Sequence, residues 1–455
     1  MSARAPWGRL PDHLASLYPT TPPSHLRRGW IVAGYTVALP VIAIVSLLRQ
    51  SGISPLASIW AEDGEVFLQQ AASHSFAWTL VHPYAGYSQL WPRLAAELAI
   101  LLPLRDAAAV LSIGGALMVA ALALLVFHAA RAHIRSRTLR ALLSASMILL
   151  PVAGAELLNN AVNIPWWLLF ATFWMLLWRP RTFAGAVLAG IVCFLATASQ
   201  VVTVVLLPLV LLRVIGLRTF RDQLATIGFL VGVACQVVMI LLNGGAGGFA
   251  GATFHDVAQA FALHVGLGWI AGSRLSSHLI TSSPQGAMAL GVTLFLVVAI
   301  LSMLQRDREL RSFAAVALAY SVVAFAVPVW LRGVGPAMVD SITNGGRYSA
   351  TPVLLVVATL LMSADRFWRR APVGTSLRPV ALRLATPLVC CAILAPCWVI
   401  DLRDSNPRST ELSWTVQVAT AQQDCRSSSA ASYYGFQTAP PGWGVALSCR
   451  FIDTH

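Results

Sequence analysis

The sequence is a series of long apolar stretches separated by short polar connections. Each stretch is near the ~20 residues that an α-helix needs to cross the hydrocarbon core of a bilayer. Since 57% of the 455 residues are hydrophobic and only 11% are charged, the chain needs lipid as a solvent for its apolar surface. We predict an all-α polytopic membrane protein with about eleven transmembrane helices. The predicted spans lie near residues 30–48, 107–129, 141–158, 164–178, 183–200, 201–217, 223–242, 286–304, 312–330, 349–364 and 384–400.

Two further apolar stretches carry charged or polar residues and are predicted to be interfacial or re-entrant helices. The first covers residues 89–103 and contains Arg93 and Glu97, and the second covers residues 257–272 and contains His264. Helical backbone that is interrupted or polar is tolerated at membrane depth only where protein or water surrounds it. The first of the two stretches belongs to a long outer loop that follows the first span.

The arginines predict the orientation of the chain. The sequence contains no lysine, so all 31 basic residues are arginine, and 21 of them fall in the N-terminal tail and in every second connection. Such alternation is typical of cytoplasmic loops and argues against a nucleic-acid binder. We therefore predict a cytoplasmic tail at 1–29 preceding a retained first helix, a transmembrane domain at 30–400, and a short extracytoplasmic tail at 401–455. The acidic residues predicted on the outer side are Glu62, Asp63, Glu65, Glu97, Asp106, Glu156, Asp256 and Asp340.

The C-terminal tail contains two of the seven cysteines, Cys425 and Cys449. In an oxidising compartment they could close a loop whose disulfide contributes about 3 kcal/mol. The other five cysteines lie in apolar segments, where a thiol behaves as a small hydrophobe, and they have no metal-ligand spacing. The tail is too small for an independent catalytic domain and is expected to act as a disulfide-held lid or an acceptor-binding flap.

Adjacent carboxylates open the first outer loop, in the segment WAEDGEVF. Glu62 and Asp63 repel each other and are costly to desolvate, so one of them has a raised pKa or shares a cation. A carboxylate of this kind suits general-base catalysis, in which it takes a proton from an attacking hydroxyl. The alternative is that both residues, with Glu65, cap and solvate a surface helix.

The same loop continues with polar and aromatic residues that suit contacts with sugar rings and hydroxyls. These candidate substrate-binding residues are His82, Tyr84, Tyr87 and Gln89. The alternative for the aromatic residues is anchoring in the membrane interface. Arg93 lies in a stretch with almost no other charge, so it should pair with a carboxylate or bind an anion such as a donor phosphate.

Two later segments add candidates on the outer side. In NNAVNIPWW, the residues Asn160, Asn163 and Trp166 lie on a very short turn, where they form either a satisfied helix cap or contacts with a polar ligand. In GGRYSATP, Arg347 and Tyr348 follow two glycines, and the arginine can approach a lipid phosphate and bind it bidentately. The alternative for Arg347 is a side chain that snorkels to the lipid headgroups.

Taken in order, the segments WAEDGEVF, YAGYSQLWPRL, NNAVNIPWW and GGRYSATP resemble the bacterial GT-C superfamily of multipass membrane glycosyltransferases over residues 30–365. The resemblance implies inverting transfer of a sugar from a polyprenyl-phosphate donor to a cell-envelope glycan or lipid acceptor at the outer face of a bacterial plasma membrane. It implies that Asp63 or Glu62 is the general base and that Arg347 holds the donor phosphate. It leaves the need for a divalent cation open, and implies membrane lipids but no nucleic acid as further partners.

The chain departs from the better-characterised branches of that superfamily because it lacks a large soluble C-terminal domain, which leaves the acceptor undefined. Two alternative functions remain at the level of sequence. A lipid or polysaccharide transporter or flippase should carry ionisable residues near mid-span and broken helices. A polysaccharide polymerase or ligase without a carboxylate base would tolerate the loss of Asp63 but not that of the outer arginines and histidines.

Overall fold

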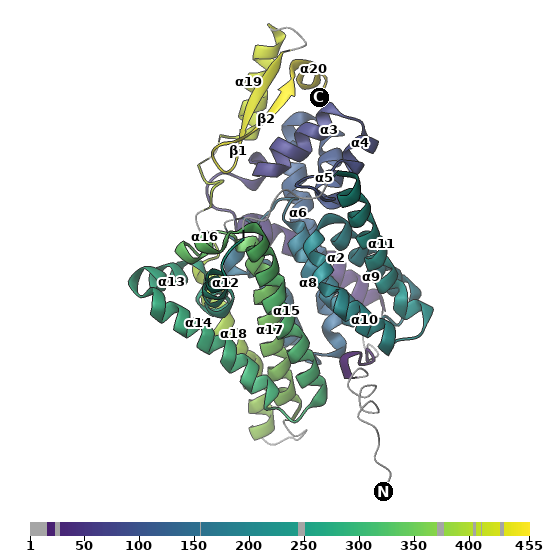
Figure 1. Ribbon diagram of the computed structural model, residues 1–455, viewed down its shortest axis with the longest axis vertical. Coiled ribbons are helices and arrows are strands. Elements are labelled where there is room, and N and C mark those ends of the chain that lie inside the picture. Colours follow the sequence, from purple (N-terminus) through teal and green to yellow (C-terminus); the bar gives the residue numbers. More distant parts are fainter. Residues whose placement is uncertain are drawn as a thin grey trace.

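Helices form most of the chain in the computed structural model, which describes residues 16–22, 28–154, 156–243, 251–370, 377–403, 406–410, 412–427 and 432–455 (Figure 1). In the N-terminal half the helices are α2 (Arg28–Leu48), α3 (Gln69–Ser73), α4 (Phe76–Val81), α5 (Leu90–Ile100), α6 (Ala107–Ala129), α7 (Arg137–Leu149), α8 (Ile164–Leu177), α9 (Phe183–Ser199), α10 (Leu207–Gly216) and α11 (Phe220–Asn243). They are followed by α12 (Phe254–Phe261), α13 (Gly268–Ser282), α14 (Pro284–Met303), α15 (Arg308–Arg332), α16 (Gly335–Asp340), α17 (Gly346–Arg370) and α18 (Leu377–Ile400). The tail adds α19 (Trp414–Arg426), β1 (Tyr433–Thr438), β2 (Trp443–Ser448) and α20 (Cys449–Thr454).

A helix without a polar face lies at the centre of the bundle. All residues of α8 are buried, as expected for a helix that is apolar on every side. It packs against α6, α9 and α17, and the main hydrophobic core includes Trp167, Trp174 and Phe170 on α8. Close helix contacts depend on small residues elsewhere, because a Cβ atom on Gly228 of α11 would overlap the backbone carbonyl of Gly190 on α9.

The structure confirms that the chain is an all-α membrane protein with several spanning helices. Within the described residues, six helices are long and apolar enough to cross a bilayer. These are Gly29–Leu48, Leu104–Ala132, Phe220–Asn243, Pro284–Met303, Arg308–Arg332 and Gly346–Arg369. Four shorter apolar helices cover Ile164–Leu177, Phe183–Ser199, Val201–Gly216 and Ala385–Ile400. The number of eleven spans stays a prediction.

One predicted span differs in the structure. In place of a continuous helix over 141–158, α7 ends at Leu149, and a 3-10 turn covers Pro151–Ala153. The residue before a proline is driven out of the α conformation, and Leu150 accordingly has φ −55° and ψ 117°. Apart from Ser144, Ser146 and Glu156 the predicted span is apolar, so its hydropathy did not reveal this break.

One of the two stretches predicted to be interfacial or re-entrant, residues 257–272, is a broken helical segment. It consists of α12, a π-helical turn η8 (Ala262–Leu267) and α13, and Gly272 interrupts α13 with φ 69°. The N–H of Ser273, freed by this break, donates to Asp401 over 2.7 Å. The other stretch, 89–103, contains the short helix α5, which does not reach the length of a span.

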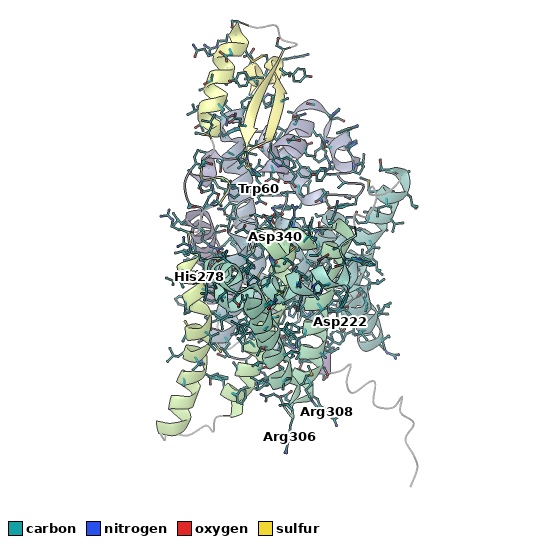
Figure 2. The ribbon with its side chains drawn as sticks, turned by 60° about the vertical axis from the view of Figure 1, so that its left-hand side comes forward. Trp60, Asp222, His278, Arg306, Arg308 and Asp340 are labelled. Carbon is teal, nitrogen blue, oxygen red and sulfur yellow. A yellow bond between two sulfur atoms is a disulfide. The ribbon has the colours of Figure 1, made fainter. Side chains whose placement is uncertain are left out.

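The two ends of the molecule carry different elements. One end, which we name the basic end, carries the α14–α15 connection with Arg306 and Arg308 (Figure 2). Here Arg366 of α17 forms ion pairs with Asp307 at 3.3 Å and Glu309 at 2.9 Å. Residues Leu17 and Tyr18 are buried in the main core, so part of the predicted N-terminal tail packs against the bundle.

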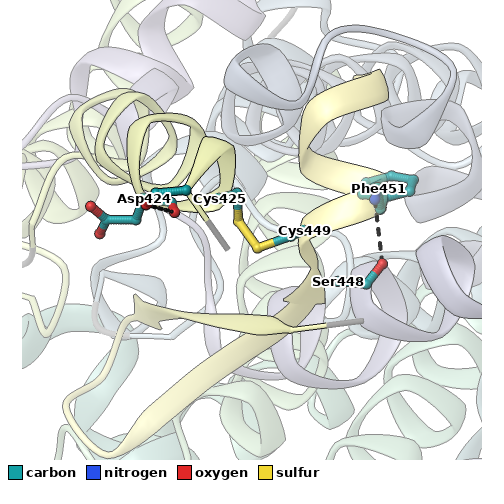
Figure 3. Close-up of a disulfide and its surroundings, with 6 residues drawn as sticks. Asp424, Cys425, Ser448, Cys449 and Phe451 are labelled. Atoms are coloured by element: carbon teal, nitrogen blue, oxygen red, sulfur yellow. Dashed lines mark hydrogen bonds between the residues drawn. A yellow bond between two sulfur atoms is a disulfide. The ribbon is translucent and has the colours of Figure 1, made fainter. Parts of the chain in front are cut away.

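The opposite end, which we name the tail end, carries α3, α4, α5 and the folded C-terminal tail (Figure 1). Strands β1 and β2 form an antiparallel hairpin, and Cys425 and Cys449 form a disulfide between α19 and α20 (Figure 3). A second hydrophobic core joins the tail to the first loop, with Trp414 and Val445 packed among Leu68 and Leu104. The tail is therefore docked on the bundle through its own core.

Candidate functional site

Asp63 joins the first loop to the asparagine-rich turn. It is the first residue of a π-helical turn, η3 (Asp63–Leu68), and its side chain is buried. Its two carboxylate oxygens accept the backbone N–H groups of Ala161 and Val162, each over 2.8 Å. Hydrogen bonds to a carboxylate are stronger than those between neutral groups. Both oxygens are thus occupied by the turn that precedes α8, and Asp63 holds the two segments together.

A buried arginine lies near this carboxylate. Arg408, from the tail, donates from Nη1 to the Gln50 side chain over 2.9 Å and to the Asn159 carbonyl over 3.1 Å. Its guanidinium carbon lies 5.5 Å from the ring centre of Trp60. Burial raises the pKa of Asp63 to about 7, against the opposing effects of the two N–H donors and Arg408. Burial also lowers the pKa of Arg408 to about 10, which leaves it charged at neutral pH.

Glu62 faces a different partner from Asp63. Its Oε1 lies 3.7 Å from Nη1 of Arg347, and 11% of the Glu62 side chain and 31% of the Arg347 side chain are exposed. The backbone N–H of Arg347 donates to Oε2 of Glu156 over 3.0 Å. Two carboxylates from separate segments therefore meet one arginine at the start of α17.

The glycines before Arg347 allow this approach. Gly345 has φ 67°, a left-handed conformation that few other residues adopt, and a Cβ atom on Gly346 would overlap the Val152 carbonyl. The first N–H groups of a helix lack intrahelical partners and carry partial positive charge. Glu156 is therefore well placed to satisfy one of them, and its carboxylate caps α17.

The segment YAGY forms a tight turn at the same site. Tyr84 and Tyr87 exchange backbone hydrogen bonds of 3.0 Å and 3.3 Å, and Ala85 and Gly86 both have positive φ, 52° and 84°. Positive φ at both central residues is the mark of a type I′ turn, which sets the two flanking residues opposite each other. The turn thereby brings two tyrosines to one side of the loop.

Charged side chains lie near enough to affect the pKa of both tyrosines. Burial raises the pKa of Tyr84 to about 12, and the charges of Glu62, Arg347 and Arg332 act on it. Burial also raises the pKa of Tyr87, whose hydroxyl lies beside the Arg332 guanidinium. At neutral pH both phenols are therefore protonated and can donate hydrogen bonds.

The asparagine turn satisfies its own polar groups. The Asn160 side chain donates to the carbonyls of Glu156 and Leu158 and accepts the N–H of Asn163 over 3.0 Å. The Asn163 amide donates to the Glu156 carbonyl over 3.0 Å. The contacts thus favour the cap interpretation of both asparagines over direct ligand contact. Trp166 meets the Tyr348 ring edge-on, with 5.2 Å between ring centres, and so supports the start of α17.

The remaining predicted residues lie behind this group. Arg93 is 2% exposed, donates from Nη1 to Gln70 over 3.0 Å, and lies 5.4 Å from the ring centre of Phe67. Phe67 in turn packs edge-on against Tyr84, so Arg93 supports the site from behind. Its Nε and Nη2 atoms have no partner among the described residues.

His82 and Gln89 take no part in the Glu62–Arg347 contact among the residues described. His82 stacks on Trp78 with ring centres 4.0 Å apart, and the pKa of His82 is lowered, first by desolvation and then by Arg93. Gln89 is buried. In the same described portion, no three His, Cys, Asp or Glu side chains form a group that could hold a metal ion.

The tail forms one wall of the site. The N–H of Ala439 donates to the Ile59 carbonyl over 3.0 Å, and the N–H of Ala61 donates to the Ala439 carbonyl. Further along, Gly444 donates its N–H to Glu65 over 3.1 Å. The first two bonds hold the segment directly before Glu62 and the third holds the turn after it, so the tail is a docked part of the site in this structure.

The sequence prediction missed one contributor and gave too small a role to two others. Arg408 was not predicted, and no local pattern marks it in the polar tail, where it follows a proline. Arg332 lies in the same late segment as Arg347 but was given no role. Glu156 did have a signal, since it is a carboxylate on a very short connection between apolar segments. The geometry of the site must stand on its own, because no family model matches the chain and no curated protein matches its sequence.

Proposed function

We propose that the chain is a membrane glycosyltransferase that moves a sugar from a polyprenyl-phosphate donor to a cell-envelope glycan or lipid acceptor, with inversion. The observation that carries the proposal is the Glu62–Arg347 pair, a carboxylate and an arginine 3.7 Å apart at the tail end. A base and a phosphate-binding cation side by side are the two groups that this reaction needs. The eleven-span topology, with the N-terminus in the cytoplasm of a bacterium, belongs to the same proposal.

In the proposed reaction, Arg347 and Arg332 bind the donor phosphate and stabilise the negative charge that forms on it. The acceptor hydroxyl attacks the anomeric carbon, the bond from that carbon to the phosphate oxygen breaks, and polyprenyl phosphate leaves. Glu62 takes the hydroxyl proton. The phenols of Tyr84 and Tyr87 donate hydrogen bonds to the sugar or the phosphate. The resemblance leaves a role for a divalent cation open.

Between the two adjacent carboxylates, the geometry favours Glu62 as the base. Asp63 uses both oxygens to hold the turn at Ala161 and Val162, and it is almost fully buried. Glu62 has a more exposed side chain and contacts the arginine directly. We assign Asp63 a positioning role, in which it places the loop that carries Glu62.

The test is transfer of radiolabelled sugar from polyprenyl-phosphate donors in membranes that contain the chain. Glu62→Gln should lower kcat about 100-fold or more, in the range typical of a lost general base. Glu65→Gln is the matched control, because Glu65 lies on the same turn and its contact is with the tail. Wild-type transfer by Glu62→Gln would end the assignment of the base.

A transporter is the second candidate, and one observation favours it. The segment α12–η8–α13 is a broken helix, a form that transporters often use for binding sites. Asp401 already occupies the free N–H groups at the break. If the wild-type protein transfers no sugar from any donor but moves labelled polyprenyl-phosphate sugar across vesicles, the transporter replaces the enzyme.

A further inference from the structure

A groove of about 480 Å³ opens between α2, α6 and α7 at the basic end. The volume falls in the range of ligand-binding clefts, about 300–1,000 Å³. Small side chains leave the space open, namely Gly34, Ala38, Ala141, Ser144 and Ala145. On another face of α2, Ala43 packs against Ala116 and Ala120 of α6.

The groove has the length of one lipid leaflet. Its lining follows α2 from Trp30 to Val45, about 22 Å at the helical rise of about 1.5 Å per residue. One leaflet is about 15 Å thick in its hydrocarbon part and about 20–22 Å thick with its headgroup region. Trp30 is 72% exposed at the start of the groove, and exposed tryptophans favour the level of the headgroups. An acyl chain in the groove would therefore run along α2 from the membrane surface inwards.

Arginines line the mouth of the groove beside Trp30. Arg131, Arg137 and Arg140 all contribute to its lining, and Arg137 and Arg140 lie three residues apart on one face of α7. Arg140 is only 5% exposed, and it donates from Nη1 to the Phe127 carbonyl over 3.1 Å. Its buried Nε has no partner among the residues that the structure describes.

Asp365, a carboxylate whose charge acts on Arg140, is already engaged with other groups. Asp365 accepts the N–H groups of Arg135 and Ser136 over 3.0 Å and 2.8 Å, and it pairs with Arg369 at 3.0 Å. A buried N–H without an acceptor is costly. A phosphate at the mouth of the groove would supply that acceptor and offset the charges of three arginines.

We propose that the groove binds an anionic phospholipid from the leaflet at the basic end, with its phosphate on Arg131, Arg137 and Arg140 and one acyl chain along α2. The site lies at the opposite end from Glu62 and Arg347, so it is separate from the proposed sugar transfer. The lipid fills the space that the small side chains leave between α2 and α7.

Native mass spectrometry of the purified full chain measures this binding directly. The protein is titrated with phosphatidylglycerol, with phosphatidylcholine and with inorganic phosphate. The expected result is tight binding of phosphatidylglycerol, weaker binding of phosphatidylcholine, and no comparable binding of inorganic phosphate. Equal binding of the two lipids would overturn the proposal, and so would displacement of phosphatidylglycerol by inorganic phosphate, since the site would then recognise a free anion.

Two pairs of arginines provide the matched comparison. Arg137→Gln with Arg140→Gln should weaken phosphatidylglycerol binding about 30-fold, at about tenfold or less per arginine near a charged surface. Arg306→Gln with Arg308→Gln removes the same charge from the same end, away from the groove (Figure 2). Equal losses in the two double variants would show that only the general charge of this end matters, which contradicts a defined site.

A variant that leaves every arginine in place tests the acyl part of the site. A Cβ atom on Gly34 or on Gly29 meets no other atom within 4 Å, so a side chain can start from either position of α2. Only Gly34 lines the groove. Gly34→Leu should weaken lipid binding while Gly29→Leu leaves it unchanged, and unchanged binding in Gly34→Leu would overturn the placement of the chain.

Discussion

At Asp63, burial and hydrogen bonding act in opposite directions on one carboxyl group. Burial favours the protonated form, whereas the N–H groups of Ala161 and Val162 and the charge of Arg408 favour the ionised form. The position requires a carboxylate, because two N–H donors need two accepting oxygens and an amide side chain has only one. A single residue thus sets how the loop with Glu62 lies against the turn before α8.

Asp63→Asn should lower the free energy of unfolding by about 1–3 kcal/mol, because one of the two backbone N–H groups would face an amide nitrogen and lose its acceptor. Thermal unfolding in detergent measures the change. Glu65→Gln serves as the control, since glutamine keeps an oxygen for the N–H of Gly444. Equal melting temperatures for wild type and Asp63→Asn would contradict the role of Asp63 in holding the first loop against the turn before α8.

The raised pKa of Asp63 predicts a pH dependence with a definite sign. Its pKa is about 7 in the folded chain and 3.8 as the reference value, so between these values the folded state binds more protons than the unfolded state. Stability therefore decreases as the pH rises from about 4 to about 7, at most about 1.4 kcal/mol per pH unit. The melting temperature of the wild type should fall relative to that of Asp63→Asn over this range. Parallel curves would mean that the N–H donors and Arg408 keep the group ionised throughout.

Arg408 and Asp63 should be energetically coupled. Arg408→Gln removes donors to Gln50 and Asn159 and a positive charge beside the buried carboxylate. We expect a loss of about 1–3 kcal/mol for the single variant, and a double variant with Asp63→Asn that is less destabilised than the sum of the two singles. Strict additivity in this cycle would show that the two side chains act independently.

At the level of elements, the sequence predicted the positions of the long spanning helices better than those of the short ones. Residues 30–48, 107–129 and 312–330 were apolar over the length of a span, and each lies in a long helix in the structure. The end of α7 depended on Pro151, a local backbone effect that hydropathy does not report. The sequence singled out the segments that hold Glu62 and Arg347. Their contact, however, joins residues 285 positions apart (347 − 62), which no local pattern reveals.

The fold of the tail was also only partly predicted from the sequence. Its two cysteines suggested a disulfide, which the structure contains, but the hairpin β1–β2 was not predicted. The residues of the hairpin pack against Leu68 and Leu104 of the first loop, so its stability comes mainly from tertiary contacts rather than from its own sequence. For the same reason, the predicted lid is a docked wall of the site in the structure.

Loss of the disulfide should loosen the tail and spare the bundle. The bond closes a loop with a sequence separation of 24, worth about 3 kcal/mol to the tail. Cys425→Ser with Cys449→Ser should become cleavable by protease between α19 and α20, while the membrane helices keep their melting temperature, because the tail has a separate core. Cys391→Ser, at an exposed free cysteine, is the control. An intact tail in the double serine variant would show that docking alone holds it.

On the scale of the whole molecule, charge is the property that orients the chain. Arg306 and Arg308 lie at one end, and Trp60 lies toward the other end (Figure 2). Retention of arginines on the cytoplasmic side predicts that the basic end is inside and that the Glu62–Arg347 site faces outwards. The proposed donor and acceptor must then both be present at the outer leaflet.

Labelling of single cysteines in intact cells tests this orientation. Arg306→Cys marks the basic end and Ser75→Cys marks the tail end, and both positions are exposed. In a background with Cys391→Ala, a membrane-impermeant maleimide should label Ser75→Cys in intact cells and Arg306→Cys only after permeabilisation. The reverse pattern would place the Glu62–Arg347 site in the cytoplasm and the lipid groove in the outer leaflet. Sugar transfer would then require a donor on the inner face, and the arginine-rich connections would break the rule that orients most membrane proteins.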